Sequence, residues 1–452
     1  MEVMDKQQAQ SVQGQVQGWP SASIGWYTVA VLFIAYTFAY VDRVILTILM
    51  ESVQRDLHIN DTQVGLLHGL AFVIFYVGLG IPLGWLADRL NRRKLVIWSI
   101  TVWSAMCAAC GLGNSFGTLF AARIGVGVGE AGLSPATFSI IGDNFPPNKR
   151  NIATGVFTVA MFVGGGLALL IGGLIVSLLG GATSVHVPLL GEMRSWQAVF
   201  IYVGVPGFLV ALLALTLKEP TRRSNTGAAL VKGTATFGQV WSRHKGAYLL
   251  HFCGYALLSV PFNVTLLWAR PFLSRAFGLS VPHAAYMMSG LMLVFASAGV
   301  LSGASMADRM QRNGKVAAGA YVGLTAALGL IIPLALLPFV SNLFIASVVL
   351  AFMLFFGSFA WGTGASSLQM FTPNNMRALM GAFYLFGINI VGLTVGPTLT
   401  GALTDYVFHD KAKVGYSAAI VSITGAIVAA ILFASLIPRF RRAVEEERAN
   451  PL

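Results

Sequence analysis

The residues of this chain that could do chemistry are four charged side chains set in apolar stretches. Asp42 and Arg43 are neighbours within the apolar run 23–50, and Arg123 and Glu130 lie seven residues apart in a second apolar run. Seven residues make about two turns of a helix, so Arg123 and Glu130 share one helix face. A charge at the centre of a membrane costs about 2.5 to 3.5 kcal/mol on insertion scales, which makes each residue a candidate functional group.

The chemistry that these residues suit is proton binding coupled to a change of ion-pair partners. Neighbouring residues on a helix point about 100° apart, so Asp42 and Arg43 are expected to meet partners on other helices. Glu130 has no cation next to it in the sequence, and a buried carboxyl group of this kind can carry a proton. Arg123 can neutralise Asp42. We therefore predict a proton-coupling site made of Glu130, Asp42, Arg43 and Arg123, with purely structural ion pairing as the alternative.

The composition indicates a membrane protein. The chain has 452 residues, of which 56% are hydrophobic and 10% charged, and a mean hydropathy of +0.74. A soluble domain carries about 25% charged residues. Apolar runs recur along the chain, and about 20 such residues cross about 30 Å of hydrocarbon. The three cysteines all fall in apolar runs, so we expect neither a metal site nor a cofactor.

The apolar runs predict an all-α membrane protein with twelve transmembrane helices. The predicted spans are 23–50, 63–87, 94–113, 116–142, 151–180, 196–217, 246–275, 284–307, 315–339, 342–371, 378–407 and 415–437. The longest polar connection is the basic linker 218–245. It divides the chain into an N-terminal six-helix bundle, 1–217, and a C-terminal six-helix bundle, 246–452.

Lys and Arg are concentrated in the even-numbered connections and near the two ends of the chain. Because short cytoplasmic loops are rich in these residues, both termini are expected in the cytoplasm. The same distribution accounts for the net charge of +12 through contact with membrane lipids, without a nucleic-acid partner. Short loops, a polar N-terminal leader without a signal peptide and a compact chain indicate a bacterial inner membrane.

Two segments of the first half recur in the second half. The run 84–93, which closes the second predicted span, resembles the run 304–313, which closes the eighth. A second pair is 145–150 and 371–377, in each of which Pro and Asn precede a basic residue. Parallel repeats related by an axis along the membrane normal are a transporter architecture. The two bundles are therefore expected to be related by pseudo-two-fold symmetry.

The first of these runs resembles the signature loop of the major facilitator superfamily. Its matching residues are Gly84, Asp88, Arg89, Arg92 and Arg93. The resemblance covers nearly the whole chain and implies the major facilitator fold, a monomer, and a cytoplasmic gate motif whose Asp and Arg bond across to the neighbouring half. Asp308 and Arg309 occupy the corresponding positions of the second half, where Ala304 replaces the glycine. Such carboxylate–guanidinium bonds can form and break as two domains rock.

A finer resemblance is to the spinster branch of that superfamily. It rests on the runs 123–135, 143–147, 372–374 and 384–389 and on the pair Asp42 and Arg43. For animal members the resemblance implies carriers of lysolipid or sphingoid-phosphate substrates.

The substrate cavity of a repeat-built transporter lies between the halves near the midplane. In the first half, Arg43, Arg123 and Glu130 are predicted to contact the polar head of a substrate. In the second half, the predicted substrate contacts are uncharged: Tyr255, Asn263, Trp268, Gln369, Tyr384 and Asn389. A charged wall facing an aromatic wall suits an amphipathic substrate, and packing between helices is the alternative for each single residue.

The sequence contains no Walker-type phosphate loop, so the energy must come from an ion gradient or from the substrate's own gradient. We expect a proton-coupled secondary active transporter that moves an amphipathic or lipid-like small molecule by alternating access. One alternative is a proton-coupled exporter of cationic drugs, because buried acids serve it equally well. A channel or lipid scramblase is an alternative of another class. An enzyme is not expected, since a lipid-modifying transferase needs acidic or histidine motifs in its loops and these loops are mainly basic.

Overall fold

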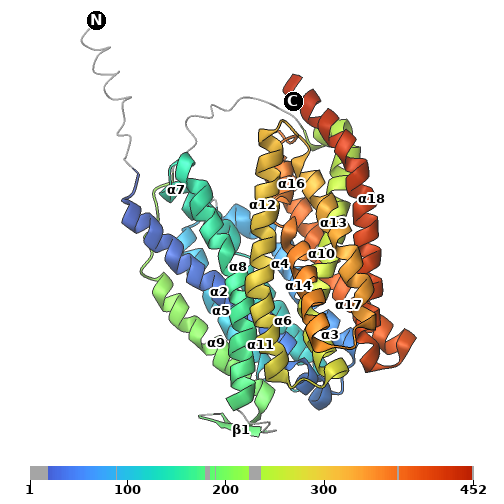
Figure 1. Cartoon of the computed structure of the whole chain (residues 1–452). Helices are drawn as coiled ribbons and strands as arrows, with labels where there is room; N and C mark the ends of the chain where they lie inside the picture. Colours follow the sequence, from blue (N-terminus) through green and yellow to red (C-terminus); the bar gives the residue numbers. More distant parts are fainter. Residues whose placement is uncertain are drawn as a thin grey trace, which may run out of the picture.

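The computed structural model describes residues 19–87, 89–178, 184–188, 190–222, 236–373 and 376–449. Long helices run between two ends of the molecule, and a short β-hairpin lies at one of them (Figure 1). We call this end the hairpin end. The opposite end, where α2 (Ala22–Leu57) begins and α18 (Val414–Ala449) finishes, is called the terminal end.

The first half consists of helices joined by short connections and one hairpin. After α2 the helices are α3 (Asp61–His68), α4 (Leu70–Ala87), α5 (Arg92–Cys110), α6 (Phe116–Glu130), α7 (Leu133–Asn144), α8 (Pro147–Leu178) and α9 (Ser195–Ala214). Strands β1 (Ser184–Val187) and β2 (Gly191–Arg194) pair antiparallel between α8 and α9. Side-chain caps begin three of the helices, since Asn60 accepts from the Gln63 N–H, Asn91 from the Lys94 N–H and Ser115 from the Thr118 N–H.

The second half has helices with π-helical or 3-10 segments between them. Its elements are α10 (Phe237–Phe277), α11 (Val281–Leu291), η1 (Met292–Ala296), α12 (Ser297–Arg312), α13 (Ala318–Leu336), η2 (Leu337–Phe339), α14 (Leu343–Phe359), α15 (Gly364–Leu368), α16 (Arg377–Gly387), η4 (Ile388–Val395), α17 (Gly396–Ala402), η5 (Leu403–Phe408), η6 (Lys411–Lys413) and α18. π-Helical turns often occur at functional sites, and η4 packs against α4 of the first half.

Eleven helical segments of the described residues are long and apolar enough to cross a membrane. The predicted span 94–113 corresponds to α5, which is outside this set and begins with the charged residues Arg92 and Arg93. Helix α5 nevertheless packs within the first half, against α6 and α9. The prediction of an all-α, multi-pass membrane protein is confirmed.

Helix α10 begins inside the segment predicted as the linker. Thr236 caps it by accepting from the Gln239 N–H, so the helix starts at Phe237 rather than near 246. His244 has non-helical backbone angles (φ −124°, ψ 24°), which mark a kink close to the predicted start of the span. The cap and the kink explain the difference, because a hydropathy pattern reports the apolar part of a helix and not its capped end.

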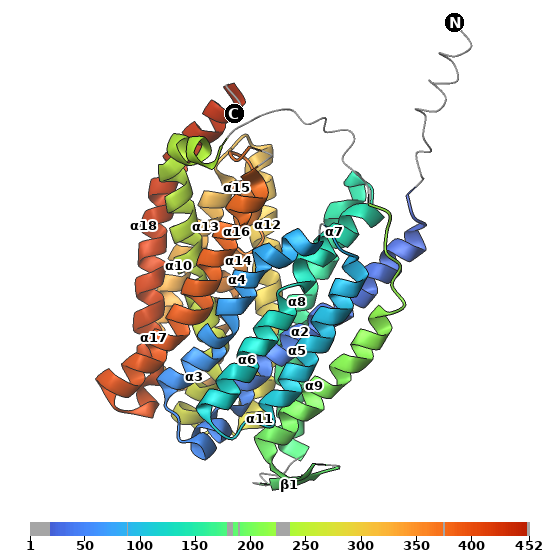
Figure 2. The ribbon, with the colours of Figure 1, turned by 180° about the vertical axis from the view of Figure 1, so that it is seen from behind.

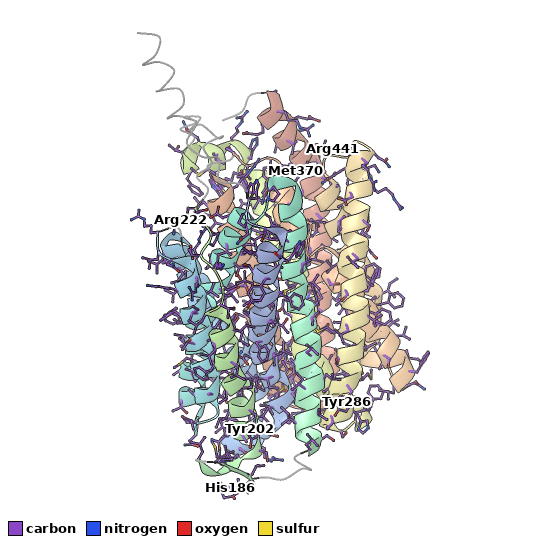
Figure 3. The ribbon with its side chains drawn as sticks, turned by 90° about the vertical axis from the view of Figure 1, so that its left-hand side faces the viewer. His186, Tyr202, Arg222, Tyr286, Met370 and Arg441 are labelled. Carbon is purple, nitrogen blue, oxygen red and sulfur yellow. The ribbon has the colours of Figure 1, made fainter. Side chains whose placement is uncertain are left out.

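The two halves meet toward the hairpin end. Helix α3 of the first half packs on α17 of the second half, and α8 packs on α11. Figure 2 shows α3, α17 and α11 in this part of the molecule. In Figure 3, His186 of β1 marks the hairpin end, whereas Arg222 and Arg441 lie toward the terminal end. The more extensive contacts between the halves therefore lie toward the hairpin end.

Glycines allow α6 to pack closely on α4 and α5. A Cβ atom at Gly127 would lie 2.4 Å from the Phe72 carbonyl oxygen, and one at Gly129 would lie 2.4 Å from the Trp103 backbone nitrogen. Neither backbone atom can move without shifting its whole helix. This close approach brings Glu130, the last residue of α6, against the neighbouring helices.

We expect Gly127→Ala to lower the unfolding free energy by about 1–3 kcal/mol, because the added methyl group overpacks the α4–α6 contact. Gly155→Ala on α8 is the matched control, since a Cβ atom there would have no neighbour within 4 Å. The measurement is thermal unfolding of both purified variants in the same detergent. Equal unfolding temperatures for the two variants would contradict the packing argument.

Candidate functional site

Arg43 of α2 and Glu130 of α6 form a buried ion pair in which Arg43 Nη2 donates to Glu130 Oε2. The two residues are 87 positions apart in the chain. Arg43 is 7% exposed and Glu130 2% exposed. A buried charge pair becomes strongly unfavourable when one partner is removed or neutralised alone. Proton binding at Glu130 would therefore remove the negative charge with which Arg43 pairs.

Aromatic rings surround the guanidinium group of Arg43. Its Cζ lies 4.5 Å from the ring centroid of Tyr40, 4.2 Å from that of Phe72 and 5.1 Å from that of Tyr76. Phe72 and Tyr76 stack with their centroids 4.9 Å apart. Cation–π contacts of this kind stabilise a desolvated cation by about 2 kcal/mol. The rings give Arg43 a defined place besides its pairing with Glu130.

Asp42 and Arg123 form the other part of the charge site. Arg123 Nη1 donates to the backbone oxygen of Asp42 at 3.3 Å, and its positive charge acts on the Asp42 carboxylate. Cys107 and Trp103 lie beside that carboxylate. Asp42 is 1% exposed and Arg123 is fully buried. Hence the structure brings together all four predicted proton-coupling residues, with Arg43 nearest Glu130 and Arg123 nearest Asp42.

Several polar atoms of this site have no hydrogen-bond partner among the described residues. They are Asp42 Oδ1, Glu130 Oε1, Arg43 Nε, Arg123 Nε and Arg123 Nη2. Buried polar groups are normally paired, so a cluster of unpaired ones is a feature that needs an explanation. The site can accept further protons or hydrogen bonds without breaking those that it already has.

In the second half, Tyr255 and Tyr384 belong to one buried aromatic cluster around His251. The His251 ring lies 4.7 Å from that of Tyr255 and 5.6 Å from that of Tyr384. Tyr255 donates to the Gly319 oxygen at 2.9 Å, and His251 Nε2 lies 3.1 Å from the Gly364 oxygen. Both predicted contact residues are thus held in place by packing and, for Tyr255, by hydrogen bonding.

The other predicted contacts of the second half are spread along its helices. Asn263 and Trp268 are buried, and their side chains donate to the backbone oxygens of Ser259 and Pro397. Asn389 of η4 is partly exposed and donates to the Leu385 oxygen of the preceding α16, whereas Gln369 is exposed. The described structure therefore does not gather these four residues into one cluster, and their role as substrate contacts stays a prediction.

The predicted gate motif of the first half contains a buried arginine. Arg92 is 1% exposed and pairs with Asp143 at the end of α7 and, at 2.8 Å, with Glu219 beyond α9. The Glu219 carboxylate also accepts from the Arg93 backbone N–H. These bonds join three helices of the same half. Asp88 lies outside the described residues.

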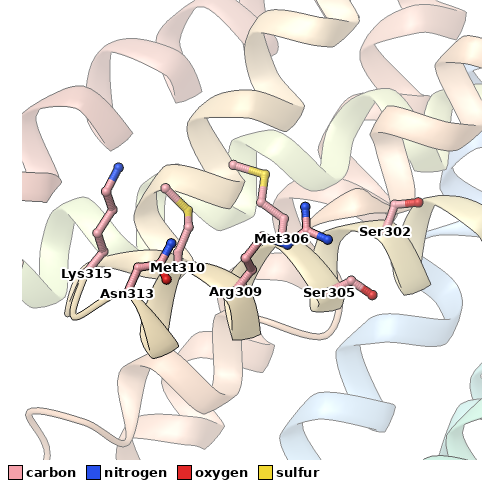
Figure 4. Close-up of a pocket in the computed structure, with 7 residues that line it drawn as sticks. All are labelled: Ser302, Ser305, Met306, Arg309, Met310, Asn313 and Lys315. Carbon is pink, nitrogen blue, oxygen red and sulfur yellow. The ribbon is translucent and has the colours of Figure 1, made fainter.

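The remaining gate residues lie at helix ends. Gly84 is in the last part of α4 and Arg89 is exposed just beyond it. In the second half, Asp308 is exposed, and Arg309 lines a pocket of about 240 Å³ at the end of α12 together with Lys315 and Asn313 (Figure 4). How these residues act in a gate stays a prediction.

A second charged cluster, which the sequence did not predict, joins the halves at the hairpin end. Arg275 of α10 donates from Nη1 and Nη2 to Asp61 of α3 at 2.7 and 3.0 Å, and Gln54 donates to the same carboxylate at 2.6 Å. Asp405 of η5 accepts from the backbone and the hydroxyl group of Thr62 at 2.7 and 2.6 Å. We call Asp61, Thr62, Arg275 and Asp405 the outer latch.

Comparison with known proteins decides the family. The family model of the Major Facilitator Superfamily matches residues 32–336. The chain belongs to this superfamily. It is an integral multi-pass facilitator protein of the secondary transporter type and not an enzyme. Its helical architecture is the major facilitator fold.

Curated relatives of this facilitator span most of its length. It is 28% identical over 427 residues to an MFS-type efflux pump of Mycolicibacterium smegmatis, covering 93% of this chain and 95% of that protein. It is 24% identical to a probable galactarate/D-glucarate transporter of Bacillus subtilis, with 95% of each chain covered. It is also 24% identical over 249 residues to protein spinster of Drosophila melanogaster, covering 55% of this chain and 39% of that protein.

A solved structure with the same fold is a bacterial homologue of the human lysosomal transporter spinster, in an inward-facing and unoccupied conformation. The TM-score is 0.76 at 23% identity, covering 94% of this chain and 98% of the other. The occupied form of that homologue matches with a TM-score of 0.71 at 24% identity and the same coverage. At this identity the likeness describes the fold of the facilitator and not its substrate.

The sequence reasoning missed His68, which lies in the same polar region as the four charges. His68 is fully buried, and the charges of Arg123 and Arg43 act on its ring. A sequence signal existed, because His68, Phe72 and Tyr76 recur every four residues and so share one helix face. No such signal existed for the outer latch, whose residues are ordinary polar groups in the first or last turns of their helical segments.

Proposed function

We propose that this facilitator is a proton-coupled secondary transporter that moves a small anionic or amphipathic molecule by alternating access. The observation that carries the proposal is the buried charge site, in which Arg43 pairs with Glu130 and Arg123 lies against Asp42. Ionisable groups inside a membrane protein cost free energy, so four of them together indicate a functional site.

Proton binding would act through the Arg43–Glu130 pair. A proton on Glu130 removes the negative charge that holds Arg43, which then stays only in its ring of Tyr40, Phe72 and Tyr76. The proton and the substrate bias the same two-state equilibrium if both prefer one arrangement of Arg43. This exchange of partners is the coupling step that we propose.

The outer latch supports alternating access. It joins α3 of the first half to α10 and η5 of the second half, and thereby closes the hairpin end. We propose that the gate motif, including Gly84, Asp88, Arg89, Arg92, Arg93, Asp308 and Arg309, closes the terminal end when the latch opens. The moving units would be the bundles 1–217 and 246–452, joined by the linker 218–245.

The names of the relatives favour an organic anion as substrate. Relatives are described as transporters of galactarate or D-glucarate, of hexuronate and of D-galactonate, all of which carry carboxylates. Arg43 and Arg123 suit such a head group. A lipid-like anion, which the likeness to spinster proteins favours, is the second candidate, because the aromatic cluster of Tyr255 and Tyr384 would suit an apolar tail. An exporter of cationic drugs is the third, since one relative is an efflux pump.

We place the transporter in a bacterial inner membrane as a monomer, with both termini in the cytoplasm. The described structure has Arg222 and Arg441 toward the terminal end (Figure 3). Basic residues prefer the cytoplasmic side. The hairpin end, with the outer latch, would then face outward, and the structure would represent an inward-facing state.

We expect Glu130→Gln to abolish substrate-driven proton movement, because glutamine keeps the shape of the side chain and cannot exchange a proton. The measurement is the internal pH of liposomes that contain the purified protein, after addition of D-glucarate, a lysolipid or a cationic dye. The matched control is Glu192→Gln on β2, whose side chain is exposed. Proton movement in the Glu130→Gln protein at the rate of the control would rule out Glu130 as the proton site.

A further inference from the structure

Arg123 presents one edge of its guanidinium group without a partner. Its Nη1 donates to the Asp42 backbone oxygen at 3.3 Å, whereas Nε and Nη2 have no partner among the described residues. The Nε–H and Nη2–H bonds are parallel and together match the two oxygens of a carboxylate. Arg123 is fully buried, so no bulk water reaches this edge.

His68 adds an unpaired group to the same region. It is the last residue of α3, fully buried, and neither ring nitrogen has a partner among the described residues. A neutral imidazole always carries one N–H donor. His68 lies four residues before Phe72, and Arg123 lies four residues before Gly127, where a Cβ atom would be 2.4 Å from the Phe72 oxygen. Because α3 also packs on α6, the two side chains belong to the same region of the α3–α4–α6 contact.

The place of His68 links this region to the second half of the molecule. Gly69 follows it at the break between α3 and α4, and a Cβ atom at Gly69 would lie 2.4 Å from the Leu393 oxygen of η4. Thr394 of η4 is buried, and its hydroxyl group also has no partner among the described residues. A ligand bound beside His68 would therefore be enclosed by both halves.

The unpaired atoms fit one kind of ligand. The free donors on Arg123 and His68 suit a carboxylate, which accepts hydrogen bonds through both oxygens. The free acceptors Asp42 Oδ1 and Glu130 Oε1 suit hydroxyl groups, which donate. A buried donor without a partner costs free energy. A ligand that accepts hydrogen bonds from these donors removes that cost when it binds.

We propose that Arg123 and His68 form the carboxylate subsite of this transporter and that its substrate is a hydroxylated organic acid. The inference rests on the proposed transport function and narrows its substrate class. The carboxylate lies along the Nε–Nη2 edge of Arg123, and the His68 N–H donates to one of its oxygens. Hydroxyl groups of the substrate reach Asp42 and Glu130, so that substrate and proton share these two acids.

The test is equilibrium binding to the purified full-length protein, followed by thermal stabilisation. The probes are D-galactonate, the neutral sugar D-galactose, and lysophosphatidate as an anionic lipid. D-galactonate should bind at least about 10-fold more tightly than D-galactose, since a hydrogen bond to a charged group contributes about 1.5–3 kcal/mol and each 1.4 kcal/mol is tenfold. His68→Phe should weaken D-galactonate binding about 10- to 100-fold, and His68→Gln, which keeps an N–H donor, should weaken it less.

Two further variants make the result specific. Arg123→Lys keeps the charge and removes the paired N–H edge, so it should also weaken D-galactonate binding. His283→Gln is the control, because His283 is exposed and bonds Ser280. Unchanged D-galactonate affinity in both His68→Phe and Arg123→Lys, or no D-galactonate binding to the wild type, would overturn the subsite. If lysophosphatidate alone binds, the substrate class is wrong, while Glu130-dependent proton movement would still support the transport function.

Discussion

Arg43→Gln is expected to lower the unfolding free energy by about 3–5 kcal/mol, because it leaves the buried Glu130 carboxylate without its cation. The aromatic rings of Tyr40, Phe72 and Tyr76 lose their cation at the same time. The measurement is chemical or thermal unfolding of the purified protein in detergent.

The double variant Arg43→Gln with Glu130→Gln distinguishes the stability lost with the ion pair from stability lost by general disruption of the site. Removing both charges leaves no stranded carboxylate, so much of the lost stability should return. A double variant whose loss equals the sum of the two single losses would show that Arg43 and Glu130 do not interact, contrary to the geometry of the pair. Transport should fail in all three proteins, because each lacks the exchange of partners.

Asp61→Asn is expected to open the hairpin end. The Asp61 carboxylate is fully buried and accepts three hydrogen bonds, two from Arg275 and one from Gln54. Charge-assisted bonds of this kind contribute about 1.5–3 kcal/mol each. Loss of one should therefore raise the fraction of molecules open at this end about 10- to 100-fold.

Opening can be measured with a cysteine at Thr398, which faces Gly65 across the contact between halves. The Thr398→Cys protein, with the exposed Cys253 replaced by serine, is treated with a membrane-impermeant maleimide. Labelling should become about 10- to 100-fold faster when Asp61→Asn is added. Arg55→Gln is the control, because Arg55 is exposed and pairs with its neighbour Asp56. Equal labelling rates with and without Asp61→Asn would show that the outer latch does not hold this end closed.

The fold was predictable because membrane helices have a strong local signal. An apolar run must be helical to satisfy its backbone in lipid, and its length is set by the bilayer. Charges in such runs are costly, so Asp42, Arg43, Arg123 and Glu130 are conspicuous from their residue type and their apolar neighbours alone. The start of α10 was less predictable, since the cap at Thr236 carries no hydropathy signal.

The charge site shows the limit of sequence reasoning. The spacing of Arg123 and Glu130 predicts a shared helix face, but not which arginine meets which acid. Their pairing depends on how α2, α4 and α6 pack, and the glycine at position 127 decides how near α6 comes to α4. The four-residue spacing of His68, Phe72 and Tyr76 marks a helix face but does not distinguish His68 from a packing residue, whereas its burial and its unpaired ring nitrogens do.

By itself the sequence determined the membrane class, the helical fold and the four charged residues, because each follows from the cost of placing polar groups in hydrocarbon. The tertiary structure alone decided that Arg43 pairs with Glu130, that the helices of His68 and Arg123 pack together, and that Asp61 meets Arg275 across the two halves. Those contacts join residues on different helices, and side-chain packing between helices is what selects them. No local pattern contains that information.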